Sequence, residues 1–192
     1  MRIIGITAAT KKNLQLDAGA LYKNWVMGTD TPATAASKLI GATVGGSTFT
    51  VTPEVRQISV DGVKGPTKGY ETIDSVTATL ATTLKEASLN SLALALAATD
   101  SAATSSVSDY TKLTMREAVA DTDYVGNIAW VGKISGSDDP MVIILKNVLN
   151  LTGLTFQAQD KNEGSVPVTL TAHYDVADLE EVPFEIWMPD IA

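Results

Sequence analysis

Residues 166–176, VPVTLTAHYDV, decide the fold class. Apolar side chains occupy every second position: Val166, Val168, Leu170, Ala172, Tyr174 and Val176. The positions between them are Pro167, Thr169, Thr171, His173 and Asp175. Because successive side chains of a strand point to opposite faces, this period of two predicts a strand with one buried face. The chain of 192 residues also holds 24 threonines, and threonine favours strands, so we expect a mainly β protein.

Residues 70–84 show the same alternation. Their apolar positions are Val76, Ala78, Leu80 and Leu84, and the opposite face is a row of hydroxyls at Ser75, Thr77, Thr79 and Thr83. The preceding run, residues 49–60, changes phase between Pro53 and Gln57, and a bulge there would account for both the change and the proline. The connection between the two runs, residues 61–69 (DGVKGPTKG), predicts a hairpin loop longer than a two-residue turn.

Three further strands are expected at residues 107–117, 124–135 and 141–151, the last two joined by GSDDP. The run 141–151, MVIILKNVLNL, also permits a helix, but its β-branched Val142, Ile143 and Ile144 favour a buried strand.

One helix is expected at residues 85–98, KEASLNSLALALAA. Leu89, Leu92 and Leu96 are spaced three and four apart, which is the spacing of one helix face, and Ser88 could cap its start. We expect these three leucines to pack on the sheet. A Ser/Ala/Thr loop, residues 99–106, follows.

The length fits one domain, residues 1–192. No stretch approaches the roughly 20 uncharged apolar residues of a membrane helix, and the opening MRIIGITAA is a poor secretory signal. We therefore expect a protein that is used without export and does not span a membrane. The absence of cysteine excludes disulfides and thiolate chemistry, and a single histidine excludes any site that needs two imidazoles.

The remaining candidates for chemistry are weak. The glycine-rich GATVGGS, residues 41–47, lacks the lysine of a phosphate-binding loop and is interpreted as a flexible connector. His173 and Asp175 share a strand face, yet no nucleophile motif accompanies them, so a surface or interface histidine is expected. The carboxylates of Asp178, Glu180, Glu181 and Glu185 lack the spacing of a calcium loop and indicate a solvated acidic strip. For Trp25, Trp130 and Trp187 we expect packing roles.

The charge is unevenly distributed along the chain. The net charge is −8, which argues against a protein that grips a phosphate backbone. Residues 1–60 carry six basic and three acidic side chains, whereas residues 61–192 carry eight and nineteen. A solvated surface explains this imbalance most simply.

Composition and motifs therefore reach a β-rich domain with one helix and no catalytic apparatus. The sequence resembles the major tail tube proteins of long-tailed, non-contractile bacteriophages. The resemblance covers residues 12–25 (KNLQLDAGALYKNW), 38–84 and 163–189. Its most specific pieces are the order of GATVGG followed by RQISVDGVKGPTKG, and the closing TAHYDVADLEEVPFEIW.

The resemblance implies a β-sandwich or partly closed barrel of antiparallel strands flanked by one helix, with extended segments at about residues 1–40 and 178–192. It implies rings of six subunits that stack head to tail into the phage tail tube, the conduit for DNA ejection. The expected partners are copies of the same chain, the tape measure, tail terminator and distal tail proteins, and double-stranded DNA that passes without tight binding. The expected location is the virion after assembly in the host cytoplasm, with no enzymatic activity and no cofactor.

Contacts between stacked rings are expected at two places. The first is the hairpin tip, with Asp61, Val63, Lys64, Pro66 and Lys68. The second is the basic front segment, with Lys11, Lys12 and Lys23, which could meet residues 160–192 of the next ring, since these hold eight acids and one base. The alternative function is a β-sandwich carbohydrate- or surface-binding module, as in a decoration or adhesin domain, which would need an exposed aromatic platform.

Overall fold

The computed structural model describes residues 5–7, 9–100 and 109–191. The strands are β1 (Ala20–Lys23), β2 (Thr43–Gln57), β3 (Glu71–Leu84), β4 (Thr99–Asp100), β5 (Thr114–Met115), β6 (Val125–Gly132), β7 (Met141–Asn150), β8 (Gln157–Gln159), β9 (Asn162–Thr171) and β10 (Phe184–Trp187). The described helices are α1 (Leu89–Ala95) and the short 3-10 turns η1 (Thr10–Asn13), η2 (Ala36–Lys38) and η3 (Asp121–Asp123). The expectation of a mainly β protein with one α-helix is confirmed.

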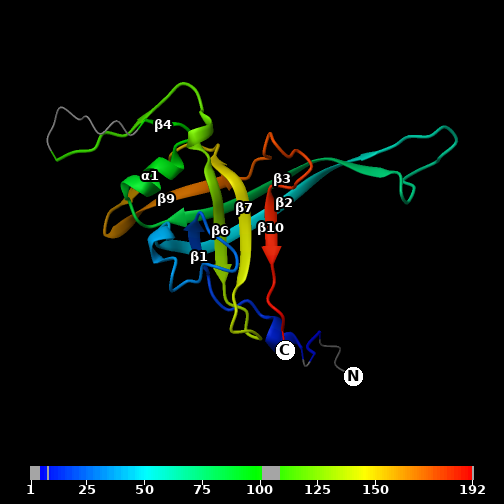
Figure 1. The fold of residues 1–192 in the computed structure, drawn as a ribbon, viewed down its shortest axis with the longest axis horizontal. Helices are drawn as coiled ribbons and strands as arrows, with labels where there is room; N and C mark the ends of the chain where they lie inside the picture. Colours follow the sequence, from blue (N-terminus) through cyan, green and yellow to red (C-terminus); the bar gives the residue numbers. More distant parts are fainter. Residues whose placement is uncertain (1–4, 8, 101–108, 192) are drawn as a thin grey trace.

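The main sheet has eight antiparallel strands and folds over on itself. Its order is β1-β6-β7-β9-β3-β2, with β10 added to β7 and β8 added to β9. β7 pairs with β6 over most of its length but with β9 only through Leu149 and Asn150. The sheet therefore turns a corner at the end of β7, and its two halves cross as the layers of an open sandwich (Figure 1). The order runs from β1 to β2 without closing into a barrel.

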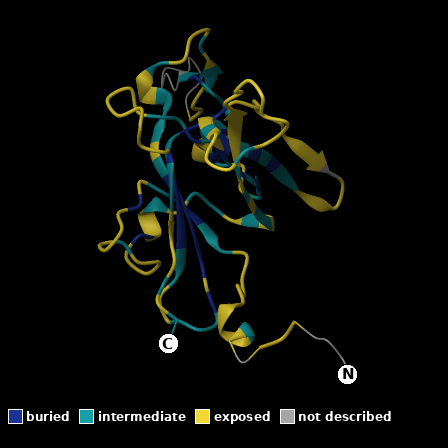
Figure 2. Cartoon of the chain, turned by 90° about the vertical axis from the view of Figure 1, so that its right-hand side faces the viewer, coloured by how far each residue is buried: buried dark blue, intermediate teal, exposed yellow. Residues whose placement is uncertain are grey.

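The main core lies between these two halves. It is formed by Leu21, Ala78, Leu80, Leu84, Ala95, Ile128, Trp130, Ile143, Leu145, Val148, Val166, Val168, Leu170 and Ala172. These residues come from β1, β6 and β7 on one side, from β3, β9 and the position directly after β9 on the other, and from α1. Figure 2 shows them as the dark centre of the strands, with exposed residues towards the loops and the projecting hairpin.

Asn150 joins the corner of the sheet to the helix. Its side chain is 1% exposed and donates through Nδ2 to the carbonyl of Ala95 at 2.7 Å. Its Oδ1 accepts from the hydroxyl of Thr152 at 2.7 Å. A buried amide that keeps its partners fixes one arrangement of the groups around it, so this residue orients α1 on the corner.

The deciding alternation holds only in part. Val166, Val168, Leu170 and Ala172 are all buried, but Tyr174 is only half-buried and Val176 is 91% exposed. β9 ends at Thr171 because the next two amides bond to different strands: Ala172 N donates to Ala78 of β3, and His173 N donates to Lys146 of β7. The chain leaves the sheet there, and the predicted strand to residue 176 is too long.

The other predicted strands differ in accuracy. Residues 124–135 and 141–151 contain β6 and β7, joined by the predicted turn, and the helical alternative for the second is wrong. Of the predicted strand 107–117, only β5 is a strand within the described residues. Residues 107 and 108 of this strand and residues 101–106 of the predicted loop lie outside the described residues.

The hairpin of β2 and β3 contains two register shifts. The first shift falls within the predicted interval, between Glu54 and Val55, but the unpaired residue is Asp74 of β3, so the predicted bulge in residues 49–60 is wrong in its strand. The second shift lies at Gly45 and Gly46, both at φ +79°, a conformation that glycine adopts without strain. The stretch GATVGGS is therefore not a flexible connector, because from Thr43 onwards it is a bulged part of β2.

The helix is shorter than predicted. Ser88 caps its first turn, since its Oγ accepts from the amide of Ser91 at 3.1 Å. Before it, Lys85 N still bonds to Ala42 as an extension of the sheet, and after it Leu96 has an extended backbone.

The buried face of α1 is also different from the predicted one. Ser91 and Ala95 are fully buried, and these small side chains let the helix backbone lie close to the sheet. Leu92 packs against the core, as expected. Leu89 is 43% exposed, so its predicted packing role is wrong, and Leu96 lies past the helix end, beside a cavity under α1.

Leu92→Asp should therefore destabilise the fold by about 3 kcal/mol, because it removes apolar contacts and places a carboxylate against the core. Leu89→Asp is the matched control on the same helix and should change stability by less than about 0.5 kcal/mol. Urea unfolding of both variants measures the difference. Equal losses would contradict the assigned helix face.

Candidate assembly surfaces

The hairpin of β2 and β3 projects from the body as an arm (Figure 1). β3 pairs with β9 only from Thr79 onwards, so the outer part of the hairpin has no third strand among the described residues. Large apolar side chains on this arm are exposed to solvent: Val55, Ile58, Val60, Val63, Tyr70 and Ile73. Isolated two-stranded hairpins gain little stability from their own packing, so such an arm is an unusual place for apolar surface.

Polar contacts keep the arm ordered along its length. Arg56 bonds to Asp74 at 2.8 Å, and Ser75 donates to Glu54 at 3.0 Å. At the far end, Ile58 N donates to Tyr70 O at 2.7 Å and closes the loop. The contact residues expected from the sequence lie in this loop and are all exposed: Asp61, Val63, Lys64, Pro66 and Lys68.

Lys11 and Lys12 lie in η1, which is near the C-terminal end of the chain and away from the arm (Figure 1). The following segment is bound to the body, since Leu16 N donates to Lys133 O and Ser135 N donates to Leu14 O. Gly136 lies so close to this segment that a Cβ there would be 2.6 Å from Lys12 O and 2.7 Å from Ile191 Cγ2. The basic front segment thus lies beside the closing segment of its own subunit, and the structure does not bring it to the hairpin tip.

Three strands of the sheet have one unpaired side. Within the described residues, β2 pairs only with β3, β8 only with β9 and β10 only with β7. By contrast, the outer side of β1 is covered, because Tyr22 is bridged to Leu39. β2 is the longest of the three edges at 15 residues. Exposed edges of this kind pair readily with strands of another chain.

The outer face of β2, β3 and β9 is lined with hydroxyl groups. Thr50, Thr79 and Thr171 face one another across the three strands, and Thr52 opposes Thr77. The register extends this face to Thr48, Thr83, Thr169 and the sequence-predicted Ser75. Glu54, the register partner of Ser75, is the acidic residue on this face, and the rows from Thr48 to Thr52 carry hydroxyl groups without a charged side chain.

The closing segment is held to the body by Lys146 of β7. The Lys146 ammonium contacts Glu181 at 2.5 Å and Glu185 at 2.6 Å, and its backbone N donates to Pro183 O at 2.8 Å. The hydrogen bond from Lys146 lowers the pKa of Glu185, while the bonds to Glu181 and then Glu185 raise the pKa of Lys146. The predicted acidic strip is therefore partly paired within the subunit.

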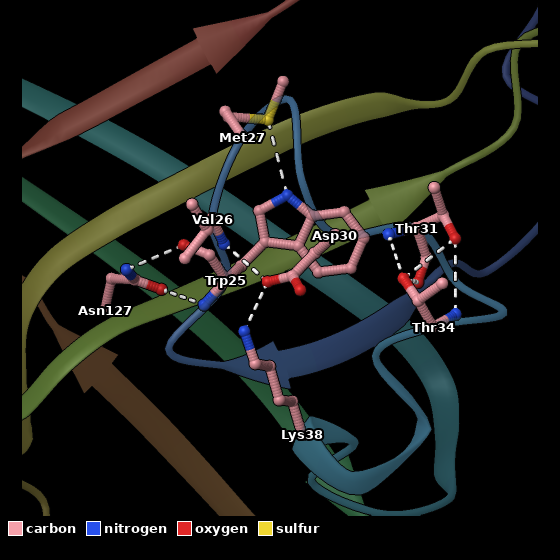
Figure 3. Close-up of polar contacts among 8 residues, drawn as sticks. All are labelled: Trp25, Val26, Met27, Asp30, Thr31, Thr34, Lys38 and Asn127. Carbon is pink, nitrogen blue, oxygen red and sulfur yellow. Dashed lines mark hydrogen bonds and ion pairs between the residues drawn. The ribbon is translucent and has the colours of Figure 1, made fainter.

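The loop between β1 and η2 is fixed by side chains (Figure 3). Asn127 accepts from the backbone N of Trp25 at 2.7 Å and donates to its carbonyl at 3.0 Å. Asp30 accepts from the amide of Val26 at 2.7 Å and contacts Lys38 at 2.5 Å, and the bond from Lys38 lowers the pKa of Asp30. This loop covers the outer face of β1, β6 and β7.

The residues considered for chemistry have structural partners. His173 Nδ1 donates to Asn147 O at 3.0 Å, and its ring meets Tyr124 edge-on at 5.1 Å. Asp175 instead accepts from the amide of Ala177. Trp25 and Trp130 are buried, as expected, whereas Trp187 is 46% exposed and donates to Glu185 at 2.7 Å.

Neither a metal cluster nor a membrane helix is found in the part of the chain that the structure describes. No group of three or more histidine, cysteine, aspartate or glutamate residues there is arranged to hold a metal ion. No helix there is long and apolar enough to cross a membrane.

Comparison with known proteins does not identify the chain. No family model matches it, and no curated protein shows significant sequence similarity to it.

The clamp at Lys146 predicts a pH dependence of stability. Because the pKa of Glu185 is lower in the folded state, the pair stabilises the fold above the unfolded pKa of 4.5 and this stabilisation is lost as the pH falls through the folded value. Lys146→Met should cost about 1 kcal/mol at pH 7, since the pair is partly exposed, and less below pH 4.5.

Urea unfolding of the wild type and this variant between pH 3 and pH 7 measures the effect. Lys133→Met, which removes an exposed lysine from the end of the neighbouring strand, is the control and should show no such trend. A Lys146→Met effect that is the same at every pH would contradict the assignment.

Proposed function

We propose that the protein is a structural subunit of a bacteriophage tail tube, in which rings of six copies stack head to tail. The observation that carries the proposal is the projecting arm, whose exposed apolar side chains have no cover in the single chain. Large apolar surfaces on soluble proteins mark contacts with other molecules. The resemblance of the sequence to tail tube proteins is strongest in the same arm and in the closing segment.

Ring formation is supported by the free edges of the sheet. A strand from a neighbouring subunit that pairs with β2 would satisfy its unpaired backbone groups and continue the sheet from one copy to the next. Repeated around an axis, such a contact between two different edges closes into a ring. Stacking through a different surface, the arm, would then extend the rings into a tube.

Passage of DNA is supported by the hydroxyl face of β2, β3 and β9. A wall of hydroxyl groups with the carboxylate of Glu54 would not attract phosphates, so double-stranded DNA would slide along it without tight binding. We assign this face to the lumen. The tape measure protein would occupy the lumen before ejection, and the tail terminator and distal tail proteins would cover the two ends of the tube. The location is then the virion, after assembly in the host cytoplasm.

Replacement of residues 61–69 by Asn-Gly tests the role of the arm. A two-residue turn can join the two strands, so the subunit should remain folded. Tubes should be absent because the exposed tip is gone. Negative-stain imaging and sedimentation of the wild type and the variant give the answer, with circular dichroism as the control for folding. Normal tubes from the variant would contradict the assignment.

Thr50→Lys tests the assignment of the lumen. Thr50 is exposed on the hydroxyl face, and the change would add one cation per subunit to the wall. Tubes of this variant should bind duplex DNA at 50 mM salt and release it as salt rises, whereas wild-type tubes should not bind. Thr50→Glu is the control for the substitution itself. Intact Thr50→Lys tubes that bind DNA along their outer surface in negative-stain images would place this face outside the lumen.

The carbohydrate- or surface-binding module is the second candidate, and Trp187 is the observation in its favour. Its half-exposed ring lies beside a groove with Met188 and Pro189. A binding platform usually needs several such rings, and the exposed Tyr70 and Tyr110 lie elsewhere in the fold. A wild-type protein that stays monomeric at high concentration would favour this function over the tube.

A further inference from the structure

A groove lies at the base of the arm, between β3 and the segment that follows β9. It has a volume of about 480 Å³ and is bounded by residues 73–76 on one side and by Tyr174, Leu179, Glu180 and Val182 on the other. Figure 1 shows this segment as the orange and red loop beside β3. Ile73 is 62%, Leu179 67% and Val182 41% exposed, so the groove has apolar walls that the subunit itself leaves open.

The rim of the groove is acidic. The segment from Tyr174 to Val182 holds Asp175, Asp178, Glu180 and Glu181 and no basic residue. Glu181 is engaged by Lys146, and Asp178 accepts from the amides of Glu180 and Glu181. Within the described residues, no ion pair joins Glu180 to a cation. A matching partner would therefore present a small apolar group with positive charge beside it.

The tip of the arm has this character. Val60 and Val63 flank a turn in which Val63 N donates to Val60 O at 3.2 Å, and both side chains are 47% exposed. Lys64 and Lys68 follow, and they give the tip a net positive charge against the single Asp61. No salt bridge of the described residues involves either lysine, so both are available to a partner.

We propose that the groove at the base of the arm is the receptor for the arm tip of a second copy of this chain. Val60 and Val63 of one subunit enter between Ile73 and Leu179 of the next, and Lys64 and Lys68 face the acidic rim. The inference rests on the proposed function, which it deepens by naming the surface that receives the arm.

The geometry of this contact favours linear growth. The tip and the groove are different surfaces, so each subunit that docks through its tip leaves its own groove open for another copy. At about 3.3 Å per strand residue, the five steps from Tyr70 to Ser75 already separate the two surfaces by roughly 17 Å along the arm. Copies that dock in the same direction are therefore displaced along the arm and grow linearly, whereas reciprocal docking of two antiparallel arms would close a pair and would give only covalent dimers on disulfide trapping.

Disulfide trapping tests this contact, because the chain has no cysteine of its own. Tubes of the double variant Val63→Cys/Leu179→Cys, oxidised with diamide, should give a ladder of covalent oligomers on a non-reducing gel. Each single variant can form at most dimers. Val63→Cys/Val119→Cys is the control, since Val119 is also exposed, at 46%, but lies outside the groove, and it should give no ladder.

The outcomes separate this inference from the proposed function. Tubes without a ladder would show that the arm docks elsewhere, while the tube function stands. A ladder from Lys11→Cys/Leu179→Cys, but not from the first pair, would assign the groove to the front segment of another copy and overturn the inference. A wild-type protein that never forms tubes would overturn both.

Exchange of the charges between the tip and the groove is a second test, which applies if the cysteine variants do not form tubes. Lys64→Glu/Lys68→Glu should slow tube growth at least tenfold, and Asp178→Lys/Glu180→Lys should do the same. The chain that carries all four changes should recover most of the rate, because the opposite charges face each other again. Failure of the fourfold variant to recover, with its fold intact, would contradict the contact.

Discussion

The fold depends on the corner at the end of β7. Only Leu149 and Asn150 join β7 to β9, and through them the two halves of the sheet become a single hydrogen-bonded surface. The same corner receives the helix, because the buried amide of Asn150 bonds to the carbonyl of Ala95. The core between the layers, the position of α1 and the direction in which β2 and β3 leave the body all follow from this junction. An amide in such a place must keep its partners, since an unpaired polar group would cost more than the bonds contribute.

The outer end of the hairpin of β2 and β3 is stabilised differently from the end near the corner. Near the corner, β3 lies between β2 and β9, and its side chains reach the core. Beyond Val76 the two strands form backbone pairs only with each other, and the ion pair Arg56–Asp74 and the bond from Ser75 to Glu54 connect their side chains. The hairpin is thus rigid where it enters the body and poorly buried where it ends. A rigid base with an exposed apolar end suits a contact that forms with another molecule, because the arm loses little freedom on docking.

Much of the fold could be predicted from local patterns, and the failures have physical causes. β3, β6, β7 and most of β9 carry long alternating or β-branched runs, which identify strands without knowledge of their partners. β1, β8 and β10 have three or four residues each, too few for a period to be visible. The buried face of α1 was missed because Ser91 and Ala95 give no apolar signal, although they are the residues closest to the sheet.

Some of the candidate surfaces could likewise be predicted from the sequence, and others could not. The exposed tip could be predicted from its glycines, its proline and its length. The clamp of Lys146 on Glu181 and Glu185 could not, because these residues meet only after β7 and the closing segment are brought together. The groove at Leu179 likewise forms between two segments that are about a hundred residues apart in the sequence. No periodic pattern in the sequence indicates that these segments meet.

The double-glycine bulge of β2 affects how readily the free protein aggregates through its open sheet edge. A straight edge of 15 residues would accept almost any extended segment, in several registers, and so invite fibrous aggregates. At Gly45 and Gly46 the ladder is interrupted and the strand twists more strongly, so a second chain cannot bond along the whole edge in one straight run. Only a strand whose own backbone follows the bend can form hydrogen bonds along the whole of β2. The bulge thereby limits non-specific strand pairing along this edge.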